Sequence, residues 1–195
     1  MIHAYIKLIC NFVNRTMSST AQILPHYTFE DWQRWEGQWE IIHGIPYAMS
    51  PMPVPKHQII ANALGAEFRF ALKKCQHCKA IQPIDYKITD DIIVQPDLLV
   101  VCKKIEKSYL DFPPSLAAEI LSPSTALKDR HTKYQIYQLQ GIRYYLIVSP
   151  DTEDVEVYEL DKGQYRLIQK GHDFTHHFSF EDDCTAEIDF GEIWK

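Results

Sequence analysis

The chain has 195 residues, of which 46% are hydrophobic and 12% aromatic, and its formal net charge at pH 7 is −6. This length and composition suit one domain with a sizeable core, and they exclude disorder over most of the chain. The negative charge argues against a protein that coats nucleic acid through bulk charge. It is compatible with an enzyme whose acidic residues are offset by bound metal.

The first residues are expected to lie outside the folded part. Residues 1–13 are apolar but too short to span a bilayer, they include Lys7, and no small-residue cleavage site follows them. Met17 opens an ordinary polar beginning and is the better candidate for the start of translation. We therefore expect residues 1–20 to form a peripheral or disordered extension and residues 21–195 to form a single domain, with no part in a membrane.

The N-terminal half predicts a helix, a hairpin and a second helix. Residues 27–36 carry aromatic side chains at helical spacing and predict a short helix. Residues 39–51 predict a hairpin that turns at His43 and Gly44. Beyond a proline-rich connector, residues 56–74 have apolar side chains near the helical period and predict a long amphipathic helix.

The C-terminal half predicts mainly strands, which cover residues 80–88, 98–102, 116–121, 143–148, 155–160 and 165–169. One helix, residues 126–140, interrupts them and stops at Gly141. The short apolar runs of the tail are expected to cover a sheet edge. This order predicts an α/β (α+β) fold, with a mixed central β-sheet flanked by helices and an N-terminal helix and hairpin before it.

The cysteines form an odd set without a spacing typical of disulfides: Cys10, Cys75, Cys78, Cys102 and Cys184. We therefore expect free thiols and a reducing, cytoplasmic compartment. Cys75 and Cys78 form one C-x-x-C pair, and without a second pair this is a weak signal for zinc.

Two acidic residues lie in or beside apolar runs in the middle of the chain. Asp97 precedes one run and Glu119 lies inside the next, 119 − 97 = 22 residues later. A buried carboxylate is costly unless it is paired or binds a metal, so two of them on neighbouring strands predict a divalent-metal site. Mg²⁺ prefers oxygen ligands, and the main-chain carbonyl of Ile120 is placed to be a third one.

A basic group follows on the next predicted helix. Asp129, Lys133 and Tyr137 recur every four residues and therefore share one helix face. If that face is turned toward the acids, Lys133 lies beside a metal-bound water and a phosphate, and the Tyr137 hydroxyl orients the lysine. A metal, a water and a basic group together are what hydrolysis of a phosphodiester needs.

These residues resemble a known group of nucleases. The segments QPDLLVV, EILSPST, KDRHTKYQIY and GIRYYLIVSP are similar to the PD-(D/E)xK nuclease superfamily, and within it to a widespread bacterial family of predicted endonucleases. The resemblance covers about residues 27–160. It implies a restriction-endonuclease-like fold and a Mg²⁺- or Mn²⁺-dependent endonuclease that hydrolyses phosphodiester bonds in double-stranded DNA.

The resemblance also implies the site residues. It assigns Asp97 and Glu119 as acidic metal ligands and Lys133 as the catalytic lysine, delivered by the following helix because Leu121 occupies the usual lysine position. His57, at the start of the long helix, is implied to face the metal site. Glu40, in the hairpin, is a further candidate acid near the site, with Asp129 and Tyr137 in support.

Other interpretations stay open at this stage. Glu119 can be half of a buried salt bridge with Arg130, and Lys133 can pair with Asp129 on a solvated helix face. The same fold can serve as a catalytically inactive module for protein or nucleic-acid interaction, or it can hydrolyse another phosphoester. Because cutting both strands of a duplex takes two sites, fold analogy also predicts a homodimer.

Overall fold

The computed structural model describes residues 24–49 and 54–195. The expected extension at residues 1–20 and most of the proline-rich connector lie outside these ranges. Within them, no helix is both long and apolar enough to cross a membrane.

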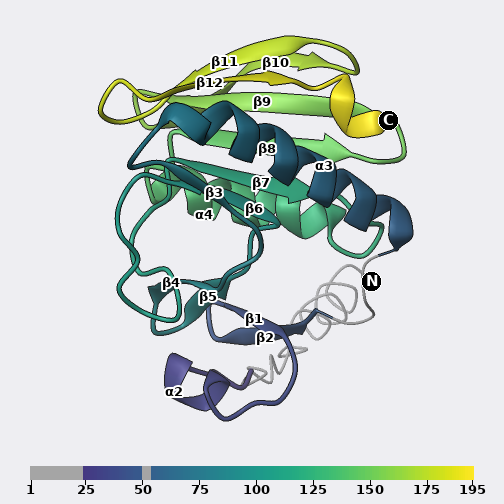
Figure 1. Ribbon diagram of the computed structural model, residues 1–195. Coiled ribbons are helices and arrows are strands. Elements are labelled where there is room, and N and C mark those ends of the chain that lie inside the picture. Colours follow the sequence, from purple (N-terminus) through teal and green to yellow (C-terminus); the bar gives the residue numbers. More distant parts are fainter. Residues whose placement is uncertain (1–23, 50–53) are drawn as a thin grey trace, which may run out of the picture.

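A mixed six-stranded sheet forms the centre of the molecule (Figure 1). Its strands are antiparallel except for one parallel pair, β7 with β8. In order across the sheet they are β10 (Gln164–Gly171), β9 (Asp154–Asp161), β8 (Tyr144–Ser149), β7 (Leu116–Ile120), β6 (Leu98–Val101) and β3 (Lys79–Ile81). The predicted fold class is therefore confirmed.

Each face of this sheet is covered by different elements. Because side chains alternate along a strand, β8 sends Tyr144, Leu146 and Val148 to one face and Tyr145 and Ile147 to the other. On the first face lie α3 (Pro55–Ala71) with its final turn η1 (Leu72–Lys74), the hairpin of β11 (Thr175–Ser179) and β12 (Thr185–Asp189), and η3 (Glu192–Trp194). On the second lie the helical segments η2 (Lys128–Lys133) and α4 (Tyr134–Leu139).

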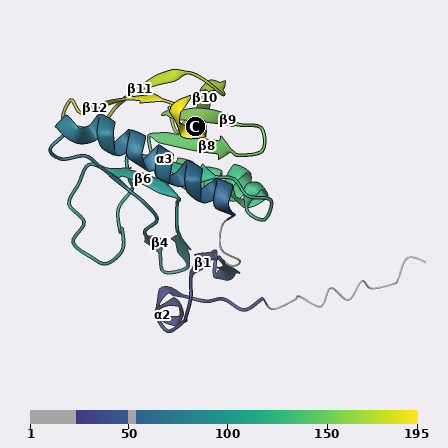
Figure 2. The ribbon, with the colours of Figure 1, turned by 45° about the vertical axis from the view of Figure 1, so that its right-hand side comes forward.

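A smaller antiparallel sheet lies below the central one, as Figure 2 shows from a second side. It contains β2 (Ile45–Ala48), β1 (Trp39–Ile42), β5 (Ile92–Val94) and β4 (Tyr86–Thr89), and the short helix α2 (Phe29–Trp32) precedes it. The predicted hairpin turning at His43 and Gly44 is confirmed, since these residues separate β1 from β2.

Two predictions about elements were wrong, and one strand was missed. Residues 80–88 are not one strand but belong to β3 and β4, which lie in different sheets, and the break contains Pro83, which cannot donate to a strand ladder. The chain continues after the turn at Asp91 into the short strand β5, which was missed. The C-terminal hairpin covers a face of the central sheet rather than an edge, because Phe178 packs on Phe68 of α3 and Tyr144 of β8.

The prediction of free thiols was also wrong. The structure pairs Cys75 with Cys184 and Cys78 with Cys102, 109 and 24 residues apart in sequence. Such separations leave no local pattern, because the partners are set by how the strands pair. The cysteines therefore no longer support a reducing, cytoplasmic compartment.

Candidate active site

Asp97 and Glu119 lie side by side at one end of the central sheet. β6 and β7 are antiparallel, and Leu98 pairs with Ala118, so Asp97, one residue before β6, stands opposite Glu119. The Asp97 Oδ2 atom accepts a hydrogen bond of 2.7 Å from the backbone N–H of Ile120. Glu119 is almost fully buried, in a strand whose residues are all buried.

Lys133 reaches the same place from the helical segment η2. Its Nζ atom lies 2.7 Å from Glu40 Oε1, 2.9 Å from Glu119 Oε1 and 3.6 Å from Asp129 Oδ1, and only 3% of its side chain is exposed. Burial alone would lower the pKa of Lys133, but these three carboxyl groups outweigh it and hold the pKa well above its ordinary value. The lysine is therefore a fixed cation.

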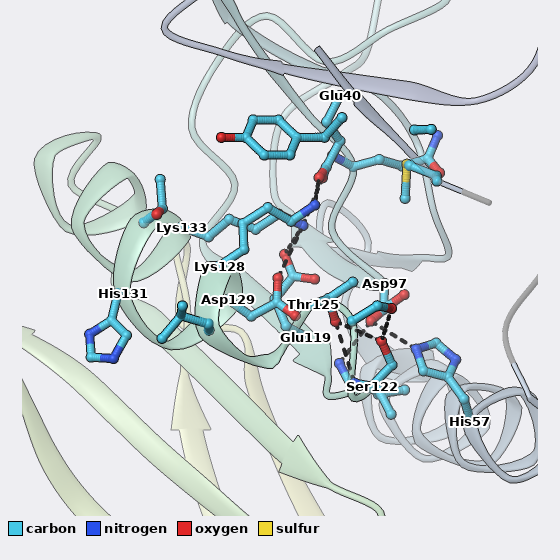
Figure 3. Close-up of a pocket in the computed structure, with 18 residues that line it drawn as sticks. Glu40, His57, Asp97, Glu119, Ser122, Thr125, Lys128, Asp129, His131 and Lys133 are labelled. Carbon is cyan, nitrogen blue, oxygen red and sulfur yellow. Dashed lines mark hydrogen bonds and ion pairs between the residues drawn. The ribbon is translucent and has the colours of Figure 1, made fainter. Parts of the chain in front are cut away.

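The backbone of η2 explains why a second lysine joins the first. Residues Lys128–Lys133 form turns of the wider π-helical type. Such turns are rare in proteins, and where they occur they often mark a functional site. A wider turn brings residues five apart toward one face, so Lys128 also reaches Glu40 and pairs with its Oε2 atom. Figure 3 shows both lysines reaching between Glu40 on one side and Asp129 and Glu119 on the other.

The acidic groups of this cluster differ in their proton affinity. Burial raises the pKa of Glu119 well above its ordinary value, more than nearby Lys133 lowers it. For Glu40, burial is outweighed by Lys133 and Lys128, so its pKa is lowered and the carboxylate is ionised. Burial also keeps the hydroxyl of Tyr137 protonated by raising its pKa, and this hydroxyl donates to Glu119 Oε1 at 2.7 Å.

His57 lies on the other side of the cluster, in the first turn of α3. Its Nε2 atom is 3.3 Å from Asp97 Oδ2, and the residue is 7% exposed. Burial by itself lowers the pKa of His57, but the hydrogen bond and charge of Asp97 outweigh it, so the pKa is raised. Among the described residues its Nδ1 atom has no hydrogen-bond partner.

These groups line one cavity of about 660 Å³. Four carboxyl groups lie on its wall, against two lysines and two histidines: Glu40, Asp97, Glu119, Asp129, Lys128, Lys133, His57 and His131. His131 points away from the others (Figure 3). Tyr137 does not line the cavity; it contacts Glu119 through the hydrogen bond from its hydroxyl.

Two carboxylate oxygens on this wall are left for a ligand. The hydrogen bonds to Glu119 both go to Oε1, while at Asp97 the hydrogen bond from Ile120 and the ion pair with His57 both use Oδ2. Within residues 24–49 and 54–195 no hydrogen bond reaches Glu119 Oε2 or Asp97 Oδ1, and the buried Asp129 Oδ1 has none either. The backbone N–H of Ile120 is used by Asp97, while the residue itself lines the cavity.

The two structural interpretations of the charged residues hold only in part: Glu119 is in a buried salt bridge, but its partner is Lys133. Arg130 does not pair with Glu119; its guanidinium binds Glu156 and Ser149 on the neighbouring strands instead. Asp129 and Lys133 do pair, but at 2% exposure they do not lie on a solvated helix face.

Sequence reasoning missed Lys128, Tyr47 and Ser122 on the cavity wall. The Lys128 amine lies 5.3 Å from the centre of the Tyr47 ring, a cation–π distance. The Ser122 hydroxyl bonds that of Thr125 at 3.0 Å. Lys128 lies five residues before Lys133, and a search at α-helical spacing does not join them.

The mixed central sheet, its flanking helices and the acidic cavity at its end together identify the fold as restriction-endonuclease-like. The family model described as "Putative restriction endonuclease" (Uma2) matches residues 27–187, and the chain belongs to this family. A crystal structure described as a putative nuclease belonging to DUF820, from Anabaena variabilis, is similar with a TM-score of 0.69 and 16% identity. The match covers 86% of this chain and 97% of that one. A search of the curated proteins found no significant match.

Proposed function

We propose that this protein is a metal-dependent endonuclease that hydrolyses phosphodiester bonds in double-stranded DNA. Families with this fold typically use divalent metal ions, and the family description names a restriction endonuclease. The proposal assigns Asp97 and Glu119 as ligands of Mg²⁺ or Mn²⁺, with the main-chain carbonyl of Ile120 as a third ligand. It assigns Lys133 as the catalytic lysine.

The observation that carries the proposal is the pair of carboxylate oxygens without hydrogen bonds. Asp97 Oδ1 and Glu119 Oε2 come from residues that face each other on neighbouring strands and line one cavity. Mg²⁺ favours such oxygens and fills its remaining positions with water and phosphate. With four carboxyl groups against two lysines, the wall attracts a divalent cation.

The charged residues of the chain have separate roles in this proposal. A bound divalent ion supplies a water of lowered pKa and offsets charge on the phosphate. Lys133, whose pKa is raised, acts as a cation that stabilises negative charge on the phosphate rather than as a proton acceptor. Glu40 holds Lys133 and Lys128 in place, and Tyr137 orients Glu119.

The supporting residues on the α3 side position the first metal ligand. His57 pairs with Asp97 Oδ2, and the backbone N–H of Ile120 binds the same oxygen. Both contacts hold Oδ2 of a residue that lines the cavity and leave Oδ1 without a hydrogen bond among the described residues. Second-sphere contacts of this kind orient metal ligands in many proteins.

Titration calorimetry with Mg²⁺ and with Mn²⁺ tests the metal site. We expect one divalent ion per chain in the wild type and no measurable binding in the double variant Asp97→Asn, Glu119→Gln, because both proposed ligands lose their charge. Glu106→Gln, on the surface and paired with Lys104, is the matched control and should bind as the wild type does. Equal binding by the double variant would show that the ion is held elsewhere.

The paired state of Lys133 favours a second candidate, a catalytically inactive module. An ion pair between Lys133 and Glu119 can also be a purely internal contact. In that case the chain keeps the fold for protein or nucleic-acid interaction and binds no divalent ion. The calorimetric titration therefore separates the two candidates.

We also propose that the protein works as a homodimer, because cleavage of both strands takes two sites. The tyrosines of β8, Tyr144 and Tyr145, are buried in the core and cannot form this interface. Exposed apolar side chains remain on the edge strand β10, at Leu167 and Ile168. Light scattering at micromolar concentration should give the dimer mass, and a monomer mass would contradict this.

A further inference from the structure

Four cysteines meet at the opposite end of α3 from His57. Cys75 follows η1, Cys78 precedes β3, Cys102 follows β6 and Cys184 precedes β12. Because Lys79 pairs with Val101, Cys78 and Cys102 face each other across two strands, with Cα atoms 3.9 Å apart. Cys75 and Cys184 have Cα atoms 5.6 Å apart. None of these residues lines the proposed nuclease cavity.

A carboxylate completes this cluster. The sulfur atoms of Cys78 and Cys102, which are bonded to each other in a disulfide, and one carboxylate oxygen of Glu181 all lie within 4.8 Å of one another. Among the residues that the structure describes, this is the only group of three such ligand atoms that close together. Two thiolates and a carboxylate from different parts of the chain are a donor set that zinc accepts.

Glu181 is held in place by its own neighbours. The hydroxyl of Ser115 donates to its carboxylate oxygens, at 2.9 and 2.7 Å. The backbone N–H of Cys184 donates to its carbonyl oxygen at 3.1 Å. A hydrogen bond to a ligating carboxylate is the usual second-sphere support of a metal site.

We propose that the reduced protein binds one zinc ion through Cys78, Cys102, Glu181 and Cys75. Cys75 is the fourth ligand because the C-x-x-C spacing lets both of its cysteines reach one ion. In a tetrahedral site with Zn–S bonds of about 2.3 Å, ligand atoms lie about 3.8 Å apart, so the Cys78 and Cys102 sulfurs would move apart from their disulfide once it is reduced. The ion would join the start of β3, the end of β6 and the turn before β12.

The disulfides and the zinc site exclude each other. A phosphine reductant cleaves each S–S bond by taking up the oxygen of one water, which yields a phosphine oxide and two thiols. Zinc binding then releases the thiol protons of its three cysteine ligands. Cys184, once freed from Cys75, is not a ligand in this proposal.

Cobalt titration of the full, phosphine-reduced chain under anaerobic conditions tests the site. Co²⁺ bound by thiolates absorbs in the near ultraviolet, so the signal does not arise from the carboxylates of the nuclease cavity. We expect the band to saturate at one Co²⁺ per chain and to vanish when Zn²⁺ is added. It should be lost in Cys78→Ser and Cys102→Ser, and Co²⁺ affinity should fall about 10–100-fold in Ser115→Ala.

Two controls make the outcome decisive. Cys184→Ser should keep the band, whereas Cys75→Ser should weaken or abolish it. In the reduced wild type, Zn²⁺ should slow alkylation of Cys75, Cys78 and Cys102, measured by mass spectrometry, and a chelator should restore it; this readout needs no variant to fold. Absence of the thiolate band, or alkylation unchanged by Zn²⁺, would overturn the proposal.

Discussion

Replacing Lys133 by methionine is expected to abolish cleavage and to lower the free energy of unfolding by about 3–5 kcal/mol. Methionine keeps most of the side-chain volume but leaves Glu40 and Glu119 buried without their shared cation. A group that stabilises charge or moves a proton in the transition state contributes about 10²–10⁴-fold to a rate, so the loss should be at least about 100-fold. Plasmid cleavage and urea unfolding measure the two effects.

Lys128→Met is the matched control for this variant. Lys128 pairs with the same glutamate, but its side chain is 16% exposed, and no ion pair joins it to Glu119 among the described residues. Its loss should cost less stability and leave some cleavage. Added Mg²⁺ should recover more stability in Lys133→Met than in the control, because an ion can offset the uncompensated carboxylates. Wild-type cleavage by Lys133→Met would remove Lys133 from the mechanism.

Replacing Glu40 by glutamine is expected to lower cleavage about 10–100-fold while leaving metal binding nearly unchanged. Glu40 is fully buried and binds Lys133, Lys128 and the backbone N–H of Gln95, so it positions the lysines without being a proposed metal ligand. Glutamine keeps the shape but removes the charge that holds both amines.

Cleavage rates and calorimetry on the same preparation of Glu40→Gln test whether cleavage falls while metal binding is retained. Glu36→Gln, on the exposed turn before β1, is the control and should behave as the wild type. If Glu40→Gln loses metal binding in parallel with cleavage, Glu40 is a ligand itself rather than a support for the lysines.

Much of the central sheet could be predicted from sequence because its strands are buried on both faces. Such strands read as continuous apolar runs, and an acid inside one of them, Glu119, stands out. Lys133 could be found because it repeats with Asp129 and Tyr137 at helical spacing. These signals are local, so they need no knowledge of the fold.

The rest of the candidate site depends on contacts between distant segments. Glu40 lies 119 − 40 = 79 residues before Glu119 and in the other sheet, and nothing near it in sequence marks it as the partner of two lysines. Lys128 was missed because η2 has π-type turns, a backbone form that α-helical spacing does not anticipate. The cysteine pairs were missed for a similar reason, since strand register brings Cys78 to Cys102.

Plasmid nicking in the presence of Mg²⁺ or Mn²⁺ tests the nuclease proposal most directly, with the wild type compared with Glu119→Gln. Glutamine keeps the size of the side chain, and Lys133 retains Glu40 and Asp129, so circular dichroism should show an unchanged fold. We expect the wild type to convert supercoiled plasmid to open-circular and linear forms only with the metal, and Glu119→Gln to leave it supercoiled. Equal nicking by the two proteins, or none by the wild type with either ion, would contradict the proposal.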